Sequence, residues 1–259
     1  MGIPMKWILT LWMMASFSAS IFAQETIRLT TAEFAPFTSQ SLKYNGVVNR
    51  VISEAFALEG IKVEYSWFPW KRAYREANEG GWSGSSYWYK TPEREKDFLF
   101  SDVVTNSTYA FFHIKGAPFD WNTLEDLQGM PIGGTIGYFY KELFEPLEKE
   151  GKLDVQWVPK DEHNLKKLLK NRIKIFPSNI DVAFDLLQIH FTPQEIKKFS
   201  YHPKPLRQSP AYLILSKKVE GNQRMLELFN RGLKRLKASG KYQQYFEESR
   251  RGEYKKADD

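Results

Sequence analysis

Among the residues of this sequence, Arg94 is the best suited to binding a small anion, and it lies in the segment Thr91-Pro-Glu-Arg94. A threonine followed by proline predicts the start of a short helix. A guanidinium group is planar and stays charged, so it can pair with a carboxylate through two parallel hydrogen bonds. The free N–H groups of the helix start would face the same anion. The alternative is a surface arginine that pairs with Glu93 or Glu95.

Aromatic residues gather just before this segment. They are Trp67, Trp70, Trp82, Tyr87, Trp88 and Tyr89. Tyrosine and tryptophan join a large apolar body to a polar tip, which suits the wall of a ligand-binding cleft. Lys71 and Arg72 could add positive charge there. Alternatively, half of the aromatic side chains are core residues and the two cations begin a solvated helix.

A second possible anion site lies at Gly137-Tyr138-Phe139, where a turn leads into a helix predicted to begin near Tyr138. Backbone N–H groups at such a turn can hold an anion. Glu33, beside Phe34 and after the first predicted strand, is the best candidate for an acidic residue in a cleft.

The residue types of common enzyme sites are scarce. The chain has no cysteine, which excludes a thiol nucleophile, a disulfide and a lipid anchor on cysteine. Its four histidines lack metal-ligand spacing, and there is no phosphate-binding loop. Gly81-Trp-Ser-Gly-Ser85 lacks the final glycine of a nucleophile elbow. We therefore expect no metal, no cofactor and no enzymatic activity.

The formal net charge of +6 is spread over several segments. Two basic clusters, within 166–174 and 231–237, read as solvated helix faces rather than as a nucleic-acid surface. We expect a monomer that binds no nucleic acid.

The N-terminus reads as a secretory signal peptide. Lys6 precedes the apolar run Trp7–Ala15, and small residues lead to Ala23. The apolar run is shorter than the roughly 20 residues that a membrane span needs. Cleavage is expected after Ala23, with Ser20 as the alternative, and the true start could be Met1 or Met5.

The remaining chain alternates strand and helix patterns, which favours an α/β fold with parallel strands. Strands are expected at 26–31, 62–68, 108–114, 131–135, 154–158, 173–176 and 211–216. Helices are expected after residue 46, up to Gly60, and over 73–78, 138–149 and 162–170, with others beginning at Pro193 and near Met225. Thr123 and Asp126 resemble a capping box.

With these elements placed, the chain resembles the family 3 extracellular solute-binding proteins, the amino-acid-type receptors of bacterial ABC importers. The most specific segment is Thr91-Pro-Glu-Arg-Glu-Lys-Asp-Phe-Leu-Phe-Ser-Asp102. Three further segments match in position, namely Phe34–Phe37, Thr123–Gly133 and Phe229–Tyr242. The likeness runs from about Glu25 to Glu248.

The resemblance implies a periplasmic-binding-protein (type II) fold, in which two α/β lobes are joined by two crossover strands. Lobe 1 would comprise residues 24–108 and 208–259, and lobe 2 residues 109–207, after a signal peptide at 1–23. The crossovers would fall near Thr108–Phe112 and Ser209–Ile214. Such proteins close by a hinge around a ligand held between the lobes.

The resemblance also assigns roles to several residues. Arg94 matches the arginine that grips the ligand's carboxylate, and Phe34 matches an aromatic position that stacks on the ligand, with core packing as the alternative. Ser85 and Ser86 lie where the family presents polar groups. The stretch from Ser85 to Arg94 is one residue longer than usual, so roles within it transfer poorly.

The largest departure from the family is Asn179, where amino-acid receptors commonly have an aspartate that pairs with the ligand's ammonium group. Asn179 can accept a hydrogen bond but carries no charge. Asp181 could substitute, although in a helix it would point elsewhere. At Gly137-Tyr138-Phe139 the family often has small hydroxyl residues. A carboxylated ligand without an amine therefore stays open.

The expected function is capture of a small polar, carboxylate-bearing solute in the periplasm, for import through an inner-membrane ABC permease. One alternative is a periplasmic sensor or orphan receptor, and an adjacent permease and ATPase gene pair would favour import. The other is a small-molecule lyase, which would be favoured by a turnover that Glu33→Gln abolishes.

Overall fold

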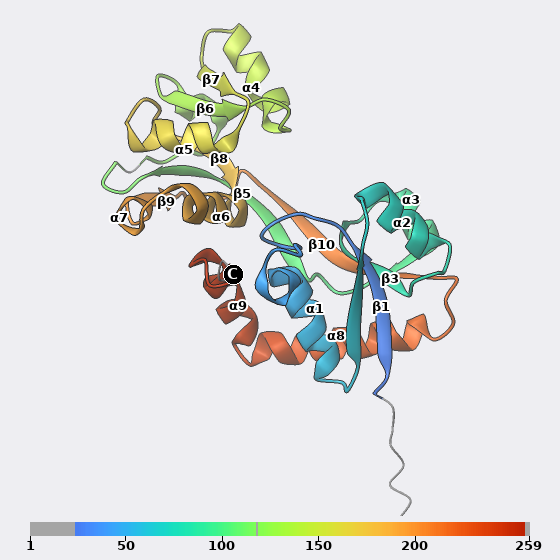
Figure 1. Ribbon diagram of the computed structural model, residues 1–259. Coiled ribbons are helices and arrows are strands. Elements are labelled where there is room, and N and C mark those ends of the chain that lie inside the picture. The colour runs from blue at the N-terminus through green and yellow to red at the C-terminus, as the bar shows by residue number, and fades with distance from the viewer. Residues whose placement is uncertain (1–23, 118, 257–259) are drawn as a thin grey trace, which may run out of the picture.

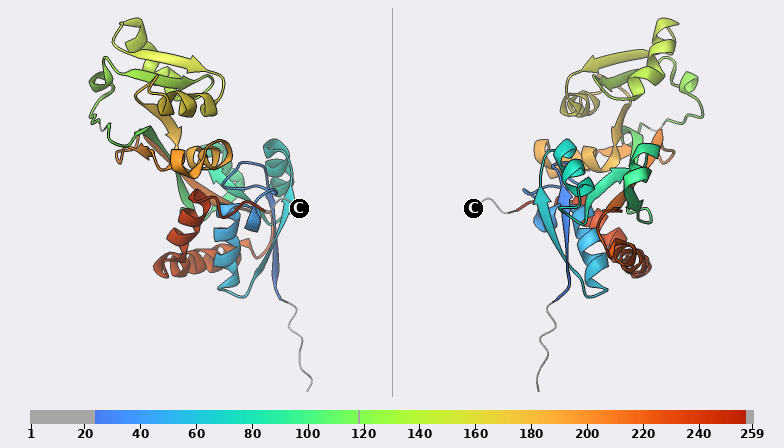
Figure 2. Two further views of the ribbon diagram at one scale, coloured as in Figure 1. Left: turned by 60° about the vertical axis from the view of Figure 1, so that its left-hand side comes forward. Right: turned by 90° about the vertical axis from the view of Figure 1, so that its right-hand side faces the viewer.

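The computed structural model describes residues 24–117 and 119–256, and these form two α/β bodies joined by a pair of long strands (Figure 1). The predicted signal peptide lies outside the described residues. Two turned views show the same two bodies and the same connection (Figure 2). Within the described ranges, no helix is long and apolar enough to cross a membrane.

The first body, lobe 1, contains both ends of the described chain. Its strands are β1 (Thr26–Thr31), β2 (Lys62–Trp67), β3 (Gly84–Tyr89) and β4 (Phe98–Phe100). Its helices are α1 (Val47–Ala57), α2 (Trp70–Asn78), α3 (Pro92–Asp97), α8 (Asn222–Ala238), α9 (Lys241–Arg250) and the 3₁₀ turn Lys43–Asn45. Strand β1 pairs in parallel with β2 and β3, as strand–helix–strand units require.

The second body, lobe 2, follows the same plan. Its strands are β6 (Pro131–Thr135), β7 (Asp154–Val158), β8 (Phe176–Asn179) and β9 (Phe199–Tyr201). Its helices are α4 (Tyr140–Lys149), α5 (Asp161–Leu169), α6 (Ile180–His190), α7 (Pro193–Ile196) and the 3₁₀ turn Leu124–Leu127. Strands β6 and β7 are parallel, and an isolated bridge from Ile132 to Ile175 links β6 to the start of β8.

Two antiparallel strands connect the lobes, β5 (Thr105–Ile114) and β10 (Arg207–Ser216). β10 pairs with β3 and β4 of lobe 1, whereas β5 pairs with β8 and β9 of lobe 2. One sheet therefore runs through both lobes in the order β2-β1-β3-β10-β5-β8. Their register places Tyr109 opposite Arg207 and Ser107 opposite Ser209. Side chains two residues apart share a face of a strand, so these four side chains point to the same side of the two-stranded ribbon.

The hydrophobic cores divide between the lobes. In lobe 1, α1 and α8 pack on one side of the sheet around Phe56 and Phe229, whose ring centroids are 5.1 Å apart. A smaller cluster under α2 is built on Trp88 and Phe98. Lobe 2 has two clusters, centred on Phe112 and Phe111. The predicted boundaries at 108/109 and 207/208 are compatible with this division and stay a prediction.

Most expected elements form, with shifted ends. The strands at 26–31, 131–135 and 154–158 are observed with those bounds, and Thr123 and Asp126 form the capping box. The strand expected at 173–176 was misplaced: the ladder with β5 runs over Phe176–Asn179, because Ile175 is held only by its bridge to β6. The closing segment breaks into α8 and α9 at Gly240, whose φ of 78° is left-handed.

Candidate functional site

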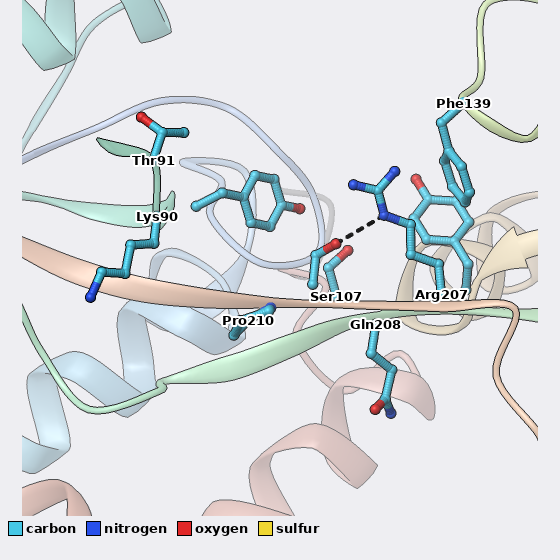
Figure 3. A pocket seen from close by; sticks show the side chains of 10 residues that line it. Lys90, Thr91, Ser107, Phe139, Arg207, Gln208 and Pro210 are labelled. Atoms are coloured by element: carbon cyan, nitrogen blue, oxygen red, sulfur yellow. Dashed lines mark hydrogen bonds between the residues drawn. The ribbon is translucent and has the colours of Figure 1, made fainter. Parts of the chain in front are cut away.

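A cavity of about 520 Å³ lies where the two lobes and the crossover strands meet. The crossover strands contribute Ser107, Tyr109, Arg207, Gln208, Ser209 and Pro210; lobe 1 contributes Tyr89, Lys90 and Thr91; and lobe 2 contributes Phe139. In Figure 3, Arg207 and Ser107 stand on one side of the strands, Gln208 points to the other, and Phe139 approaches from lobe 2. A volume of this size suits a small molecule.

Arg94 lines a second cavity of about 310 Å³ in lobe 1, together with Phe34, Trp70, Tyr87, Trp88 and Tyr89. Its Nη1 donates to the backbone oxygen of Tyr89 at 2.7 Å, and its guanidinium carbon lies 4.9 Å from the ring centroid of Trp88. Tyr89 lines both cavities, so they adjoin. The backbone contact and the indole ring fix the guanidinium beside an aromatic wall.

The short helix α3 positions Arg94 as the sequence predicts. Thr91 is its N-cap and accepts a hydrogen bond from the backbone N–H of Arg94, with Pro92 at the first helical position. Among the residues that the structure describes, no carboxylate lies within 4 Å of the Arg94 guanidinium. Glu95 instead pairs with Lys90 at 2.6 Å. The alternative of an arginine neutralised by its own helix is therefore wrong for the described residues.

Tyr87 is re-aimed by a β-bulge in β3. Trp88 pairs with Tyr212 and Ser85 with Ile214, so β3 has one residue more than β10 over this stretch. Tyr87 takes a φ of 60°, which is rare for a large side chain and typical of functional sites. Its ring packs against Phe37, and its buried hydroxyl has no hydrogen-bond partner among the described residues. Burial raises the pKa of this hydroxyl far above its usual range, so it stays neutral.

The two serines of β3 are buried and bonded within lobe 1. Ser85 Oγ donates to the backbone oxygen of Thr30 and accepts from Trp88 Nε1 at 2.7 Å. Ser86 Oγ donates to Thr31 Oγ1. Neither lines the two cavities, and their role as ligand contacts stays a prediction.

Glu33 and Arg72 lie apart from Arg94. Glu33 lines a separate groove of about 440 Å³ that shares Trp70 with the Arg94 cavity, and its carboxylate accepts from the backbone N–H of Gln40. Arg72 pairs with Glu76 at 3.1 Å on the exposed side of α2 and stacks on Phe68. This arrangement favours the solvated-helix interpretation of Arg72.

In lobe 2, the turn Gly137-Tyr138-Phe139 faces the cavity through Phe139. Helix α4 begins at Tyr140, two residues later than expected, and no side chain caps it. Tyr138 donates to Asp161 Oδ2 at 3.1 Å and covers that carboxylate, which is buried. Burial raises the pKa of Asp161, and burial together with the neighbouring Asp161 charge raises the pKa of Tyr138.

Asn179 is the N-cap of α6. Its Oδ1 accepts from the backbone N–H groups of Asp181 and Val182, and its Nδ2 donates to Ser107 Oγ at 2.9 Å. Asp181 points away, as expected of a residue within α6, and pairs with Arg250 of α9 at 2.6 Å. The Asn179 oxygen is therefore already occupied, and its role as a ligand contact stays a prediction.

The sequence analysis missed Arg207, Tyr109 and Ser107. The usable signal was the alternation at the start of β10, where Arg207 and Ser209 share a face, but the partner strand became known only from the structure. Within 24–117 and 119–256, no cluster of three or more histidine or acidic side chains could hold a metal ion.

Known proteins of similar structure have the same two-lobed organisation. One is the open-conformation substrate-binding domain 2 of Lactococcus lactis GlnP, with a TM-score of 0.70 and 17% identity over 92% of this chain and 98% of that one. The second substrate-binding domain of a putative amino acid ABC transporter from Streptococcus pneumoniae gives a TM-score of 0.69 and 17% identity, covering 87% and 99%. An ancestral cationic amino acid solute-binding protein gives a TM-score of 0.64 and 20% identity over 89% of this chain and 96% of that one.

These likenesses confirm the type II periplasmic-binding-protein fold. No curated protein sequence matches the chain. The model of the bacterial extracellular solute-binding proteins, family 3, matches residues 27–249. That family consists of receptors rather than enzymes, which confirms the expected absence of catalysis. The chain belongs to the bacterial extracellular solute-binding proteins, family 3.

Proposed function

We propose that this protein captures a small carboxylate-bearing, amino-acid-like solute between its lobes by hinge closure and delivers it to an ABC permease. The observation that carries the proposal is Arg94, held by the Tyr89 backbone oxygen and the Trp88 ring in an aromatic cavity beside the interlobe space. A fixed guanidinium with no carboxylate of residues 24–117 or 119–256 within 4 Å is ready to pair with a ligand carboxylate through two hydrogen bonds.

The aromatic residues around Arg94 fit the same role. Phe34, Phe37 and Tyr87 pack together, and Phe34 is the most exposed of the three rings and lines the cavity. An apolar ring can pack on the body of a solute whose charged end meets Arg94.

We further propose that the chain works in the periplasm as a monomer, released from a signal peptide cut after Ala23. The support is the basic and apolar start of the sequence together with membership in an extracellular family. Cell fractionation with sequencing of the mature N-terminus tests this. A chain retained in the membrane with Lys6 still present would contradict it.

The test of ligand capture is a thermal-shift screen of amino acids, small carboxylates, amines and oligosaccharides, followed by calorimetry on the hits. A ligand that binds the native state raises the melting temperature by mass action. Arg94→Met should weaken binding of any carboxylated hit by about 2–5 kcal/mol, because the anion loses its partner in a closed cleft.

The matched control is Arg172→Met. Arg172 is an exposed arginine of lobe 2 that lines neither cavity, so affinity should not change. Hits that are mostly neutral sugars, or an unchanged affinity in Arg94→Met, would refute the proposal.

A further inference from the structure

The interlobe cavity, which adjoins the Arg94 cavity, is lined by a further arginine, Arg207, that the match to family motifs did not assign. Arg207 lies at the lobe 2 end of β10, opposite Tyr109 on β5. Its Nε donates to Ser209 Oγ at 3.2 Å, the dashed line in Figure 3, and its guanidinium carbon lies 4.6 Å from the ring centroid of Phe139. These contacts hold the group in the cavity and leave its two Nη atoms without a partner among the described residues.

Most arginines of the described chain are neutralised by a carboxylate within 4 Å. The exceptions among them are Arg28, Arg94, Arg172 and Arg207. Both arginines that line the two adjoining cavities are therefore exceptions. The third cation at the cavity, Lys90, is paired with Glu95.

The cavities also lack negative charge. No aspartate or glutamate of the described residues lines either of them. Asp161, a buried acid of lobe 2, lies beneath Tyr138 and accepts a hydrogen bond from its hydroxyl. Glu93 lines the neighbouring groove that Arg94 also borders. Within the two cavities themselves, a cationic group of a ligand would meet no carboxylate of the described residues, whereas an anionic group would meet an arginine in each.

Hinge closure would turn the excess of positive charge in the two cavities into an energetic cost. Removing water from an unpaired guanidinium is strongly unfavourable unless an anion replaces the water. A ligand with one anionic group would leave either Arg94 or Arg207 uncompensated in the closed cleft. A ligand with two anionic groups would pair with both, and the aromatic side chains that line the two cavities, with Tyr89 common to both, suit an apolar spacer.

We infer that the solute is a small dianion, such as a dicarboxylate, with one anionic group on Arg94 and the other on Arg207. This inference rests on the proposed function, because it assumes closure around a ligand held by Arg94. It adds Arg207 as the residue that selects two anionic groups over one.

The test uses calorimetry and thermal shift with unbranched diacids from malonate to pimelate, each compared with the monoacid of equal carbon number. We expect at least one diacid to bind about 10- to 100-fold more tightly than its monoacid, the effect of one added charge-assisted contact. Arg207→Met should remove that advantage, because the diacid loses a partner while the monoacid no longer leaves Arg207 uncompensated in the closed cleft. Methionine keeps an apolar stem against Phe139, and Arg207→Gln serves as a second variant.

The controls separate the two ideas. Arg94→Met should weaken the binding of both the diacid and the monoacid, and Arg172→Met should change the binding of neither. If Arg94→Met weakens both acids but Arg207→Met leaves their ratio unchanged, the dianion inference fails and the proposed function survives. If Arg94→Met changes neither, the proposed function fails. If no diacid binds the wild-type protein, the dianion inference is wrong.

Discussion

The ion pair between Asp181 and Arg250 ties the two lobes together, and its removal should destabilise the protein measurably. Asp181 lies in the first turn of α6 in lobe 2, and Arg250 at the end of α9 in lobe 1, with Nε and Oδ1 2.6 Å apart. The two helices are adjacent in Figure 1. Gln188 of α6 adds a hydrogen bond to the Arg250 backbone oxygen.

The size of the effect follows from burial. The Asp181 side chain is 5% exposed and that of Arg250 28%, so the pair lies between the fully buried and the surface case. Replacing one partner of a buried ion pair lowers the free energy of unfolding by about 3–5 kcal/mol, whereas an exposed pair contributes about 0–1 kcal/mol to it. The α6 N-terminus still favours the remaining carboxylate by about 0.3–1 kcal/mol. We therefore expect Arg250→Met to lower the free energy of unfolding by about 2–3 kcal/mol.

The assay is thermal unfolding of a double-mutant cycle with Asp181→Asn. For a chain of this size, the loss corresponds to a fall in melting temperature of about 4–12 °C. The coupling within the cycle should be about 1–2 kcal/mol. The control is the exposed pair Arg224–Glu25, whose side chains are 59% and 44% exposed and whose coupling should stay below about 0.5 kcal/mol. Equal coupling in both cycles would refute the reasoning.

Two further predictions concern the interior of each lobe. In lobe 1, Gly232→Ala should lower the free energy of unfolding by about 3 kcal/mol, and with it the melting temperature, because the added Cβ would lie 2.0 Å from the Ala55 backbone oxygen. The control is Gly81→Ala, whose added Cβ would have its nearest contact at 3.6 Å. Equal melting temperatures of the two variants would contradict the close packing of α1 and α8. In lobe 2, burial raises the pKa of Asp161 above its ordinary value of 3.8, so the native state holds this proton more tightly than the unfolded chain, and stability falls as the pH rises through the native pKa. Asp161→Asn does not titrate, so its melting temperature relative to the wild type should increase from about pH 4 to pH 7, and a difference that stays constant would refute this.

The interlobe site was only partly predictable because the signals differ in range. Arg94 was found because Thr91 and Pro92 mark a helix start within three residues, which is local chemistry. Arg207 reaches the adjoining cavity from β10, far along the chain, and its partner strand is set by the sheet. The bulge that turns Tyr87 toward the cavity depends on what β10 offers opposite it, so β3 alone does not specify it.

Burial and pairing also depend on distant segments. Ser85 and Ser86 remain predicted ligand contacts, and the structure adds that their hydroxyls bond to β1, which the chain brings alongside β3. Asn179 remains a predicted ligand contact, and the structure adds that it caps α6 and donates a hydrogen bond to Ser107.

The amino-acid sequence by itself determined the α/β pattern, the start of α3 and the position of Arg94, because caps, periodicity and the family motif act over a few neighbouring residues. The tertiary structure alone decided that Arg207 lines the interlobe cavity and that Asp181 forms an ion pair with Arg250. The physical reason is that such contacts join segments tens of residues apart, and their geometry exists only once the sheet and the two cores have formed.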